Sequence, residues 1–217
     1  MQTSALSIDL AQNVDIPNHF YSNPVTASAL LDAVALFEME GSKWMLGLPF
    51  DHWDDQLHEH CFDEVRHTKI VKDLALHLRS QMNDEQIVQE CKLNIAFYRS
   101  IERYISRLSR KIFKLSLSLG IGNIEFSQTA YSFLGFAIER RIMKIYPHFS
   151  KLSPDSMVRK QSKQIIHDER KHLGFVGEKL ENGFSFTDTT QKEIIKIEEA
   201  VANEWIQEMV NAYTSVC

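Results

Sequence analysis

The sequence predicts an all-α protein, an antiparallel four-helix bundle with additional helices in one crossover and at the C-terminal end. Three observations support this prediction. Apolar residues recur at helical spacing through most of the chain, and no segment alternates as a half-buried strand would. Glycine and proline, which interrupt helices and strands, number only eight and five among 217 residues. Long helices therefore fit this chain better than a β architecture with many turns.

Six helices are expected, separated by short segments that contain glycine, proline or asparagine. The first shows the pattern well, because Leu31, Val34 and Ala35 form one apolar stripe along it. The third is either continuous or broken near its middle. The predicted ranges, in chain order, are 26–46, 52–81, 84–119, 124–146, 154–181 and 187–214.

Capping and breaking residues set several of these boundaries. Asp51 is a candidate N-cap for the second helix, and Ser153 with Pro154 fits the cap and the first residue of the fifth. Pro147 is expected to end the fourth helix, because proline lacks the backbone N–H that continues a helix. Residues 1–22 are expected to form a flexible, poorly structured lead-in.

Composition indicates a single domain over residues 1–217, with the bundle proper at about 26–181. The chain is 44% hydrophobic and 24% charged, which suits one globular core. Its formal net charge of −5 does not favour a nucleic acid as partner, and no apolar run is long enough to cross a membrane. The three cysteines form no Cys-x-x-Cys pair and no signal-peptide pattern begins the chain, so a reducing, cytoplasmic setting is expected.

Two five-residue strings, at 63–67 and 168–172, share the pattern Asp-Glu-x-x-His on predicted helices. Residues three apart lie on one helix face about a turn apart, so the glutamate and the histidine of each string can reach the same metal ion. One such string is weak evidence, because exposed helices often hold glutamate and histidine. The second copy makes a metal site the better interpretation.

A further glutamate precedes each string and lies on the helix before it, across the bend that joins the two helices. Glu38 follows the apolar residues 35–37, and Glu139 follows the largely apolar run 133–138. A carboxylate that faces an apolar core is costly unless it is neutralised or bound to a metal. Glu40 is the alternative to Glu38, but only Glu38 continues the apolar stripe of its helix.

A glutamate on one bundle helix, followed by Glu-x-x-His on the next and repeated once, resembles the ferritin-like di-iron and di-manganese carboxylate proteins. The resemblance covers residues 26–181 in two half-motifs. It implies a ferritin-like bundle that binds two iron ions, with manganese or a mixed iron–manganese pair as alternatives. The implied metal ligands, which are also the implied catalytic residues, are the bridging Glu64 and Glu169, the terminal Glu38 and Glu139, and His67 and His172 with one nitrogen each.

Four neighbouring residues are weaker candidates. Asp63 and Asp168 directly precede the bridging glutamates and are expected to accept hydrogen bonds from the outer ring nitrogens of the opposite half's histidines, unless they are ordinary surface aspartates. His60 lies one turn before Glu64 and is either a polar neighbour, an extra ligand or a proton relay. Cys61 is expected to pack as a small apolar residue.

The resemblance leaves two classes of function open. One is an oxidase or oxygenase that activates O2 to oxidise an apolar or carrier-bound organic substrate, with electrons from an external donor. The other is a ferroxidase, iron-storage or peroxide-reducing protein. The inserted helix at 84–119 and the tail helix favour the first class, because added helices can build a substrate pocket. We therefore expect a monomer or dimer, and pocket walls that include Phe37, Tyr131, Phe136, Met143 and Phe175.

The inserted helix also carries a row of basic side chains at steps of three and four residues, which place them on one face. A solvated amphipathic face is one interpretation. A docking surface for an anionic partner, such as a carrier protein, a coenzyme-A tail or an RNA backbone, is the other. The row consists of Arg99, Arg103, Arg107, Arg110 and Lys114.

Overall fold

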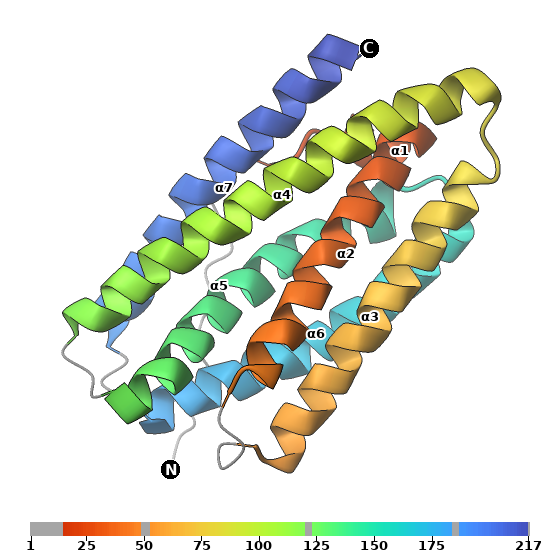
Figure 1. Cartoon of the computed structure of the whole chain (residues 1–217). Coiled ribbons are helices and arrows are strands. Elements are labelled where there is room, and N and C mark those ends of the chain that lie inside the picture. The colour runs from red at the N-terminus through yellow and green to blue at the C-terminus, as the bar shows by residue number, and fades with distance from the viewer. Residues whose placement is uncertain (1–14, 49–52, 120–122, 184–186, 217) are drawn as a thin grey trace.

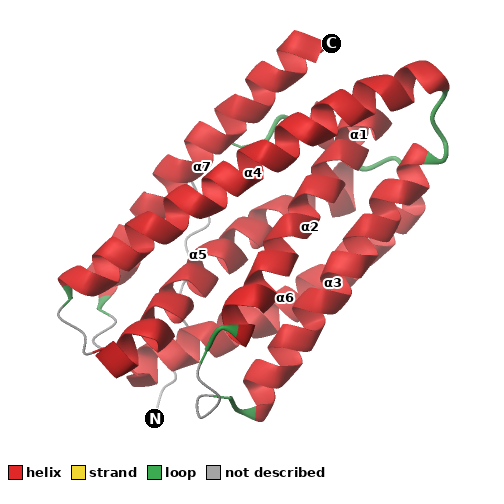
Figure 2. Cartoon of the chain, viewed as in Figure 1, coloured by secondary structure: helices red, strands yellow, loops and turns green. Residues whose placement is uncertain are grey.

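The structure, a computed structural model, describes residues 15–48, 53–119, 123–183 and 187–216. Every regular element in these ranges is a helix, and no strand occurs in them (Figures 1 and 2). The helices are α1 (His19–Ser22), α2 (Pro24–Leu46), α3 (Asp55–Arg79), α4 (Asp84–Ser118), α5 (Asn123–Leu152), α6 (Ser156–Gly183) and α7 (Asp188–Val216).

Four of the long helices form an antiparallel bundle. The hairpin α2–α3 lies beside the hairpin α5–α6, and the two hairpins meet where α3 contacts α6 and α2 contacts α5 (Figure 1). The inserted helix α4 packs on α2 and α5, and the tail helix α7 packs on α4 and α5. The additional helices expected from the sequence therefore form a second pair against one side of the bundle.

An aromatic cluster joins this second pair to the bundle. Phe37 of α2, Tyr104 of α4 and Trp205 of α7 are all fully buried, and their ring centroids lie 5.2 to 5.5 Å apart. Edge-on and tilted contacts at these distances are favourable, and large aromatic side chains remove much apolar surface from water. The added helices thus share the core of the bundle.

The segment before the bundle is more ordered than the sequence predicts. Residues 19–22 of the expected lead-in form helix α1, whose Phe20 and Tyr21 are buried. Phe20 stacks on Phe97 of α4, with centroids 5.4 Å apart. The prediction missed this helix because its stability comes from aromatic burial, and four residues are too few to show a helical period.

Helix α2 begins at Pro24, two residues before the predicted start, and the side chain of Asn23 caps it by accepting the Val25 N–H. Helix α3 begins at Asp55, where the Asp54 carboxylate accepts the Leu57 N–H at 2.8 Å. The predicted cap, Asp51, lies outside the described residues.

Two other predicted boundaries are wrong. Helix α5 continues through Pro147 to Leu152, where the sequence suggested an end. Buried side chains on both sides of the proline, Tyr146 and Phe149, pack into the core, and this packing outweighs the missing backbone hydrogen bond. Helix α6 begins at Ser156 and is capped by Asp155, which accepts the N–H groups of Met157 and Val158.

Ion pairs hold α7 in place. The buried Arg141 guanidinium donates to the Glu198 carboxylate at 2.7 and 3.0 Å, and the Tyr104 hydroxyl donates to the same carboxylate at 2.8 Å. Nearer the surface, Arg103 and Arg107 of the basic row both pair with Glu208 of α7. These two members of the row therefore serve an internal contact. None of the helices in the described ranges combines the length and the apolar character needed to cross a bilayer.

Candidate metal centre

Acidic and imidazole side chains from four helices converge in the middle of the bundle. Each of them is at most 4% exposed, although the surrounding side chains are mostly apolar. Burying so many ionisable groups without ions or protons to neutralise them is strongly unfavourable. They are Glu38 from α2, His60, Glu64 and His67 from α3, Glu139 from α5, and Glu169 and His172 from α6.

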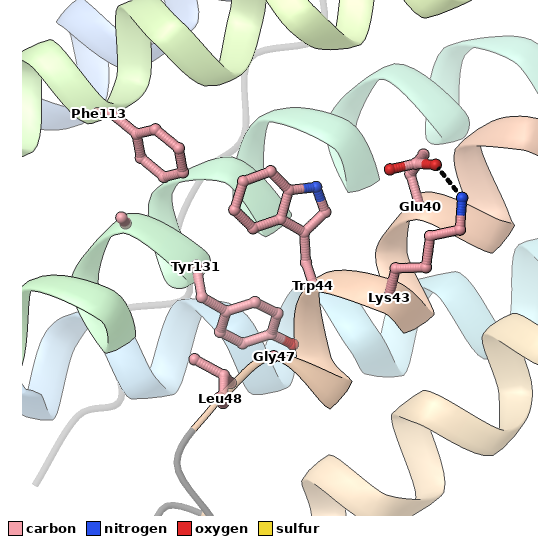
Figure 3. A pocket seen from close by; sticks show the side chains of 8 residues that line it. Glu40, Lys43, Trp44, Gly47, Leu48, Phe113 and Tyr131 are labelled. Carbon is pink, nitrogen blue, oxygen red and sulfur yellow. Dashed lines mark hydrogen bonds and ion pairs between the residues drawn. The ribbon is translucent and has the colours of Figure 1, made fainter.

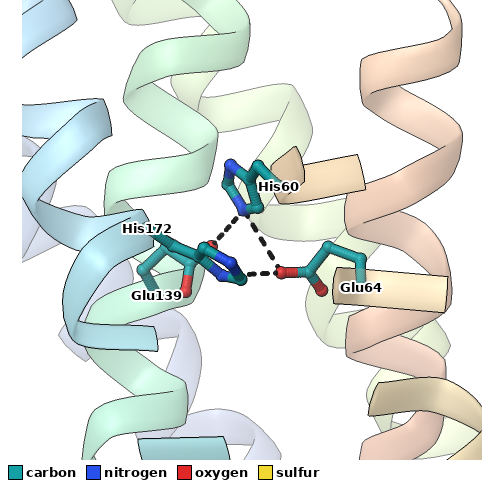
Figure 4. A group of neighbouring side chains, drawn as sticks. All are labelled: His60, Glu64, Glu139 and His172. Carbon is teal, nitrogen blue, oxygen red and sulfur yellow. Dashed lines mark hydrogen bonds and ion pairs between the residues drawn. The ribbon is translucent and has the colours of Figure 1, made fainter. Parts of the chain in front are cut away.

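These side chains form two overlapping sets that could each hold an ion, with donor atoms within 4.8 Å of one another. The first donor group consists of Glu38, Glu64, His67 and Glu169. The second donor group consists of His60, Glu64, Glu139 and His172, and Figure 4 shows its side chains turned toward one another. All six ligands implied by the sequence are present, and Glu64 belongs to both groups.

Glu169 reaches both motif histidines. Its Oε1 atom lies 2.8 Å from Nδ1 of His67, and its Oε2 atom lies 3.0 Å from Nδ1 of His172. Glu64 is also within reach of His172, with Oε1 3.3 Å from Nδ1. Each of the two glutamates from the Glu-x-x-His strings is therefore placed between positions where two ions could lie.

The outer nitrogens of the same histidines face the opposite half of the chain. Nε2 of His67 lies 3.4 Å from Asp168, and Nε2 of His172 lies 3.3 Å from Asp63. These are the cross-half contacts expected from the sequence. Arg66 joins the two aspartates at the surface, with distances of 2.5 Å to Asp63 and 3.0 Å to Asp168.

The two glutamates near the end of α2 have different surroundings. Glu38 is fully buried and accepts a hydrogen bond from the Tyr146 hydroxyl, whereas Glu40 is partly exposed and pairs with Lys43 at 2.5 Å. Only Glu38 therefore belongs to the cluster. Gly41, the residue after Glu40, permits close approach of Glu64, because a Cβ atom at position 41 would lie 3.2 Å from the Glu64 carboxylate.

Burial and the charges of neighbouring side chains shift the pKa values within the cluster in different directions. Burial and the Glu169 charge raise the pKa of Glu64 and of Glu139 well above the usual value for glutamate. Burial also acts to raise the pKa of Glu169, but the two histidines outweigh it and hold the pKa well below that value. Burial lowers the pKa of His67 and His172, yet the facing carboxylates outweigh it and raise these values to about 11 and about 10.

The donor atoms fit a pair of cations better than they fit one another. Within the described part of the chain, six buried donor atoms of this cluster have no hydrogen-bond partner. Donors on neighbouring positions of one octahedral ion, with bonds of about 2.1 Å, lie about 3 Å apart, close to several distances seen here. Four carboxylates also carry the charge that two divalent cations neutralise. The unpartnered atoms are Oε2 of Glu38, both carboxylate oxygens of Glu64, Nδ1 of His67, Oε2 of Glu139 and Oε1 of Glu169.

His60 belongs to the cluster more closely than a polar neighbour would. Its Nε2 atom lies 3.0 Å from Glu139 and 3.2 Å from Glu64, and its ring stacks on that of His172 with centroids 4.0 Å apart. Burial lowers the pKa of His60 to about 3, so its ring is neutral. The signal in the sequence was the four-residue step from His60 to Glu64, which puts both on one helix face.

A small cavity of about 20 Å³, room for one water-sized molecule, lies beside His60, Glu64 and Glu139. A larger pocket of about 270 Å³ lies farther out, between α2, α4 and α5 (Figure 3). Trp44 and Tyr131 line both cavities. The larger pocket and the small cavity thus share these two aromatic side chains as walls.

Among the residues expected to form pocket walls, Tyr131 is the one that lines the two cavities described above. Tyr131 lines the pocket, but Phe136 is buried elsewhere on α5, with the Arg140 guanidinium 6.0 Å from its ring centroid. Phe37 is part of the aromatic cluster with Tyr104. Cys61 is buried beside the centre and is not among the residues of either donor group.

Comparisons with protein-family models, with curated protein sequences and with solved structures give no match to this chain. The interpretation of the site therefore depends on its own geometry and chemistry.

Proposed function

We propose that this protein is a ferritin-like dimetal carboxylate enzyme, an oxidase or oxygenase that activates O2 to oxidise an apolar or carrier-bound organic substrate. The observation that carries this proposal is the convergence of four carboxylates and three imidazoles inside a helical bundle. Six of their donor atoms have no hydrogen-bond partner among the residues that the structure describes. A fold alone does not decide a function, so the donor set and the pocket beside it provide the support.

The side chains divide the binding of two ions among themselves. Glu38 and His67 would hold one ion, Glu139 and His172 would hold the other, and Glu64 and Glu169 would bridge them. Carboxylate-rich ligation with few nitrogens suits iron or manganese, singly or as a mixed pair. Such ions, when bound in their reduced state, supply the electrons that activate dioxygen.

The outer aspartates orient the histidines for this task. If Asp168 accepts the Nε2–H of His67, the lone pair of Nδ1 faces the carboxylate cluster. Asp63 does the same for His172 from the other half of the chain. The carboxylates also strengthen the imidazoles as donors, because a negative partner raises their basicity.

The lining of the larger pocket is the evidence for an organic substrate. Its walls are mainly Trp44, Leu48, Phe113 and Tyr131, and ligand pockets are typically apolar with a few placed polar groups. Lys43 and Glu40 both line this pocket and form an ion pair (Figure 3), so its described walls do not carry the net negative charge that would draw in metal cations. These features favour an oxidase or oxygenase over a ferroxidase.

Iron reconstitution and oxygen pulses test this function. We expect purified protein to bind two ferrous ions per chain without oxygen, and to remain a monomer or dimer by light scattering. A pulse of O2 should oxidise the bound iron, and further O2 consumption should require an external reductant. Continued oxidation of added ferrous iron into a mineral would support the ferroxidase alternative, and failure to bind iron would contradict both.

A further inference from the structure

The two donor groups differ in the atoms that they offer. The first has three carboxylates and one imidazole, that of His67. The second has two carboxylates and two imidazoles, those of His60 and His172. The bundle is built from two similar half-motifs, yet its centre is richer in nitrogen on one side.

Like the other two histidines, His60 directs one ring nitrogen toward the carboxylates, although for His60 this atom is Nε2 and for the other two it is Nδ1. One nitrogen, Nε2, faces Glu139 and Glu64, and the other, Nδ1, lies 3.4 Å from the Tyr131 hydroxyl. His67 and His172 likewise have one nitrogen toward the carboxylates and one toward an outer partner. An inward nitrogen with a hydrogen-bonded outer nitrogen is the usual arrangement of a metal-binding histidine.

The sequence provides this nitrogen only once. His60 stands four residues before Glu64, and the same step before Glu169 leads to Ile165, which is buried and has no donor atom. The outer partner differs as well, since Tyr131 offers a neutral hydroxyl where His67 and His172 have aspartates.

We infer that His60 is a further metal ligand and that it makes the two ion positions chemically inequivalent. This inference rests on the proposed function, because it requires two bound ions. Imidazole favours later first-row ions, whereas carboxylate suits Mn²⁺. The position in the second donor group should therefore prefer Fe²⁺ or Co²⁺ over Mn²⁺ more strongly than the position in the first.

Displacement of Mn²⁺ by Co²⁺ tests this inference without any measurement of turnover. Protein saturated with Mn²⁺ is titrated with Co²⁺, released Mn²⁺ is followed by electron paramagnetic resonance, and bound Co²⁺ by absorption. For the wild type we expect two displacement steps whose Co²⁺ concentrations differ by about tenfold or more. In His60→Ala the two steps should lie within about threefold of each other, since both positions then offer one imidazole.

Two further variants separate the effect of this ligand from general damage. His60→Gln keeps a polar side chain of similar size and should give the same result if His60→Ala does not fold. His58→Ala removes an exposed imidazole from the same helix and should keep both steps. The inference would be overturned if both His60 variants kept two displacement steps as far apart as in the wild type, or if the wild type gave a single step. Either result would leave the proposed function standing. A wild type that binds neither ion would overturn both.

Discussion

Nδ1 of His67 lies 2.8 Å from Oε1 of Glu169, yet neither atom has a hydrogen-bond partner among the residues that the structure describes. Both atoms are fully buried. Two polar atoms this close, but not aligned for a hydrogen bond, have the separation of neighbouring ligands on one ion. The pair is the clearest local sign of where a cation would bind.

Removing one bridging carboxylate should remove both ions. Glu64→Ala and Glu169→Ala each take away a ligand shared by two positions, so we expect metal content to fall from two ions per chain toward none. His67→Ala should weaken mainly one ion. Elemental analysis of the purified variants measures this, and an equal loss in all three would contradict the bridging roles.

An outer aspartate should tune affinity without changing capacity. Asp168→Asn replaces the anionic partner of His67 with a neutral amide, so the imidazole becomes a weaker donor. We expect metal affinity to fall by about tenfold to 100-fold, with two ions still bound at saturation. Asp73→Asn, on the exposed face of the same bundle, is the matched control. Unchanged affinity in Asp168→Asn would show that the contact has no such role.

Gly41 should be needed for metal binding, because a side chain at this position would crowd the Glu64 carboxylate. In Gly41→Ala the new methyl group would lie 3.2 Å from the Glu64 carboxylate, which must then shift within a closely packed site. We expect weaker metal binding, measured by calorimetric titration. Gly174→Ala adds a methyl group that, apart from its own helix backbone, has no described heavy atom within 4 Å. This variant should leave binding intact while stabilising α6 by roughly 0.5–1 kcal/mol. Equal binding in the two variants would argue against this role for Gly41.

The buried ion pair of α7 should be costly to break. In Glu198→Gln the Arg141 guanidinium loses its charged partner in a site where its side chain is 3% exposed. We expect the free energy of unfolding to fall by about 3–5 kcal/mol in urea denaturation. Glu199→Gln, whose carboxylate lies 4.0 Å from Lys144 and is partly exposed, should cost less than about 1 kcal/mol. A similar small loss in both would mean that the buried pair is not coupled to folding.

Asp32 should make stability depend on pH. Burial acts to raise the pKa of Asp32, but hydrogen bonds from Lys72 and Asn94 outweigh it and hold the pKa below the usual value. The ionised form therefore stabilises the folded state above the unfolded pKa, and this stabilisation is lost as the pH falls through the folded pKa. Asp32→Asn should be less stable than the wild type at neutral pH, and the two should converge in acid. Urea denaturation at several pH values measures this, and a constant difference across the series would contradict it.

Most of the candidate site could be predicted because its candidate ligands follow helical geometry. The three-residue step from Glu64 to His67 recurs from Glu169 to His172, and any helix places such a pair on one face. Glu38 could be chosen over Glu40 because only Glu38 lies on the apolar stripe. These predictions depend on short-range spacing, which the sequence shows directly.

The features that could not be predicted depend on tertiary contacts. Pro147 remains inside α5 because Tyr146 and Phe149 are buried by other helices, which no local pattern reveals. Phe113, whose side chain reaches the pocket from α4, could not be placed before the packing of α4 on α2 was known. The four-residue step from His60 to Glu64 is apparent in the sequence, but the choice between a polar neighbour and a ligand depended on the position of Glu139.

The crossed contacts of the two aspartates mean that neither hairpin contains a complete centre. The α2–α3 hairpin carries His67, but the carboxylate that contacts the outer nitrogen of this ring comes from α6. In the same way, the outer nitrogen of His172 on α6 contacts a carboxylate from α3. A chain whose hairpins have formed but have not yet docked therefore offers only half-sites to an ion. Tight ion binding should accordingly begin when the hairpins dock. The time at which ions bind during refolding would therefore report when the two halves assemble.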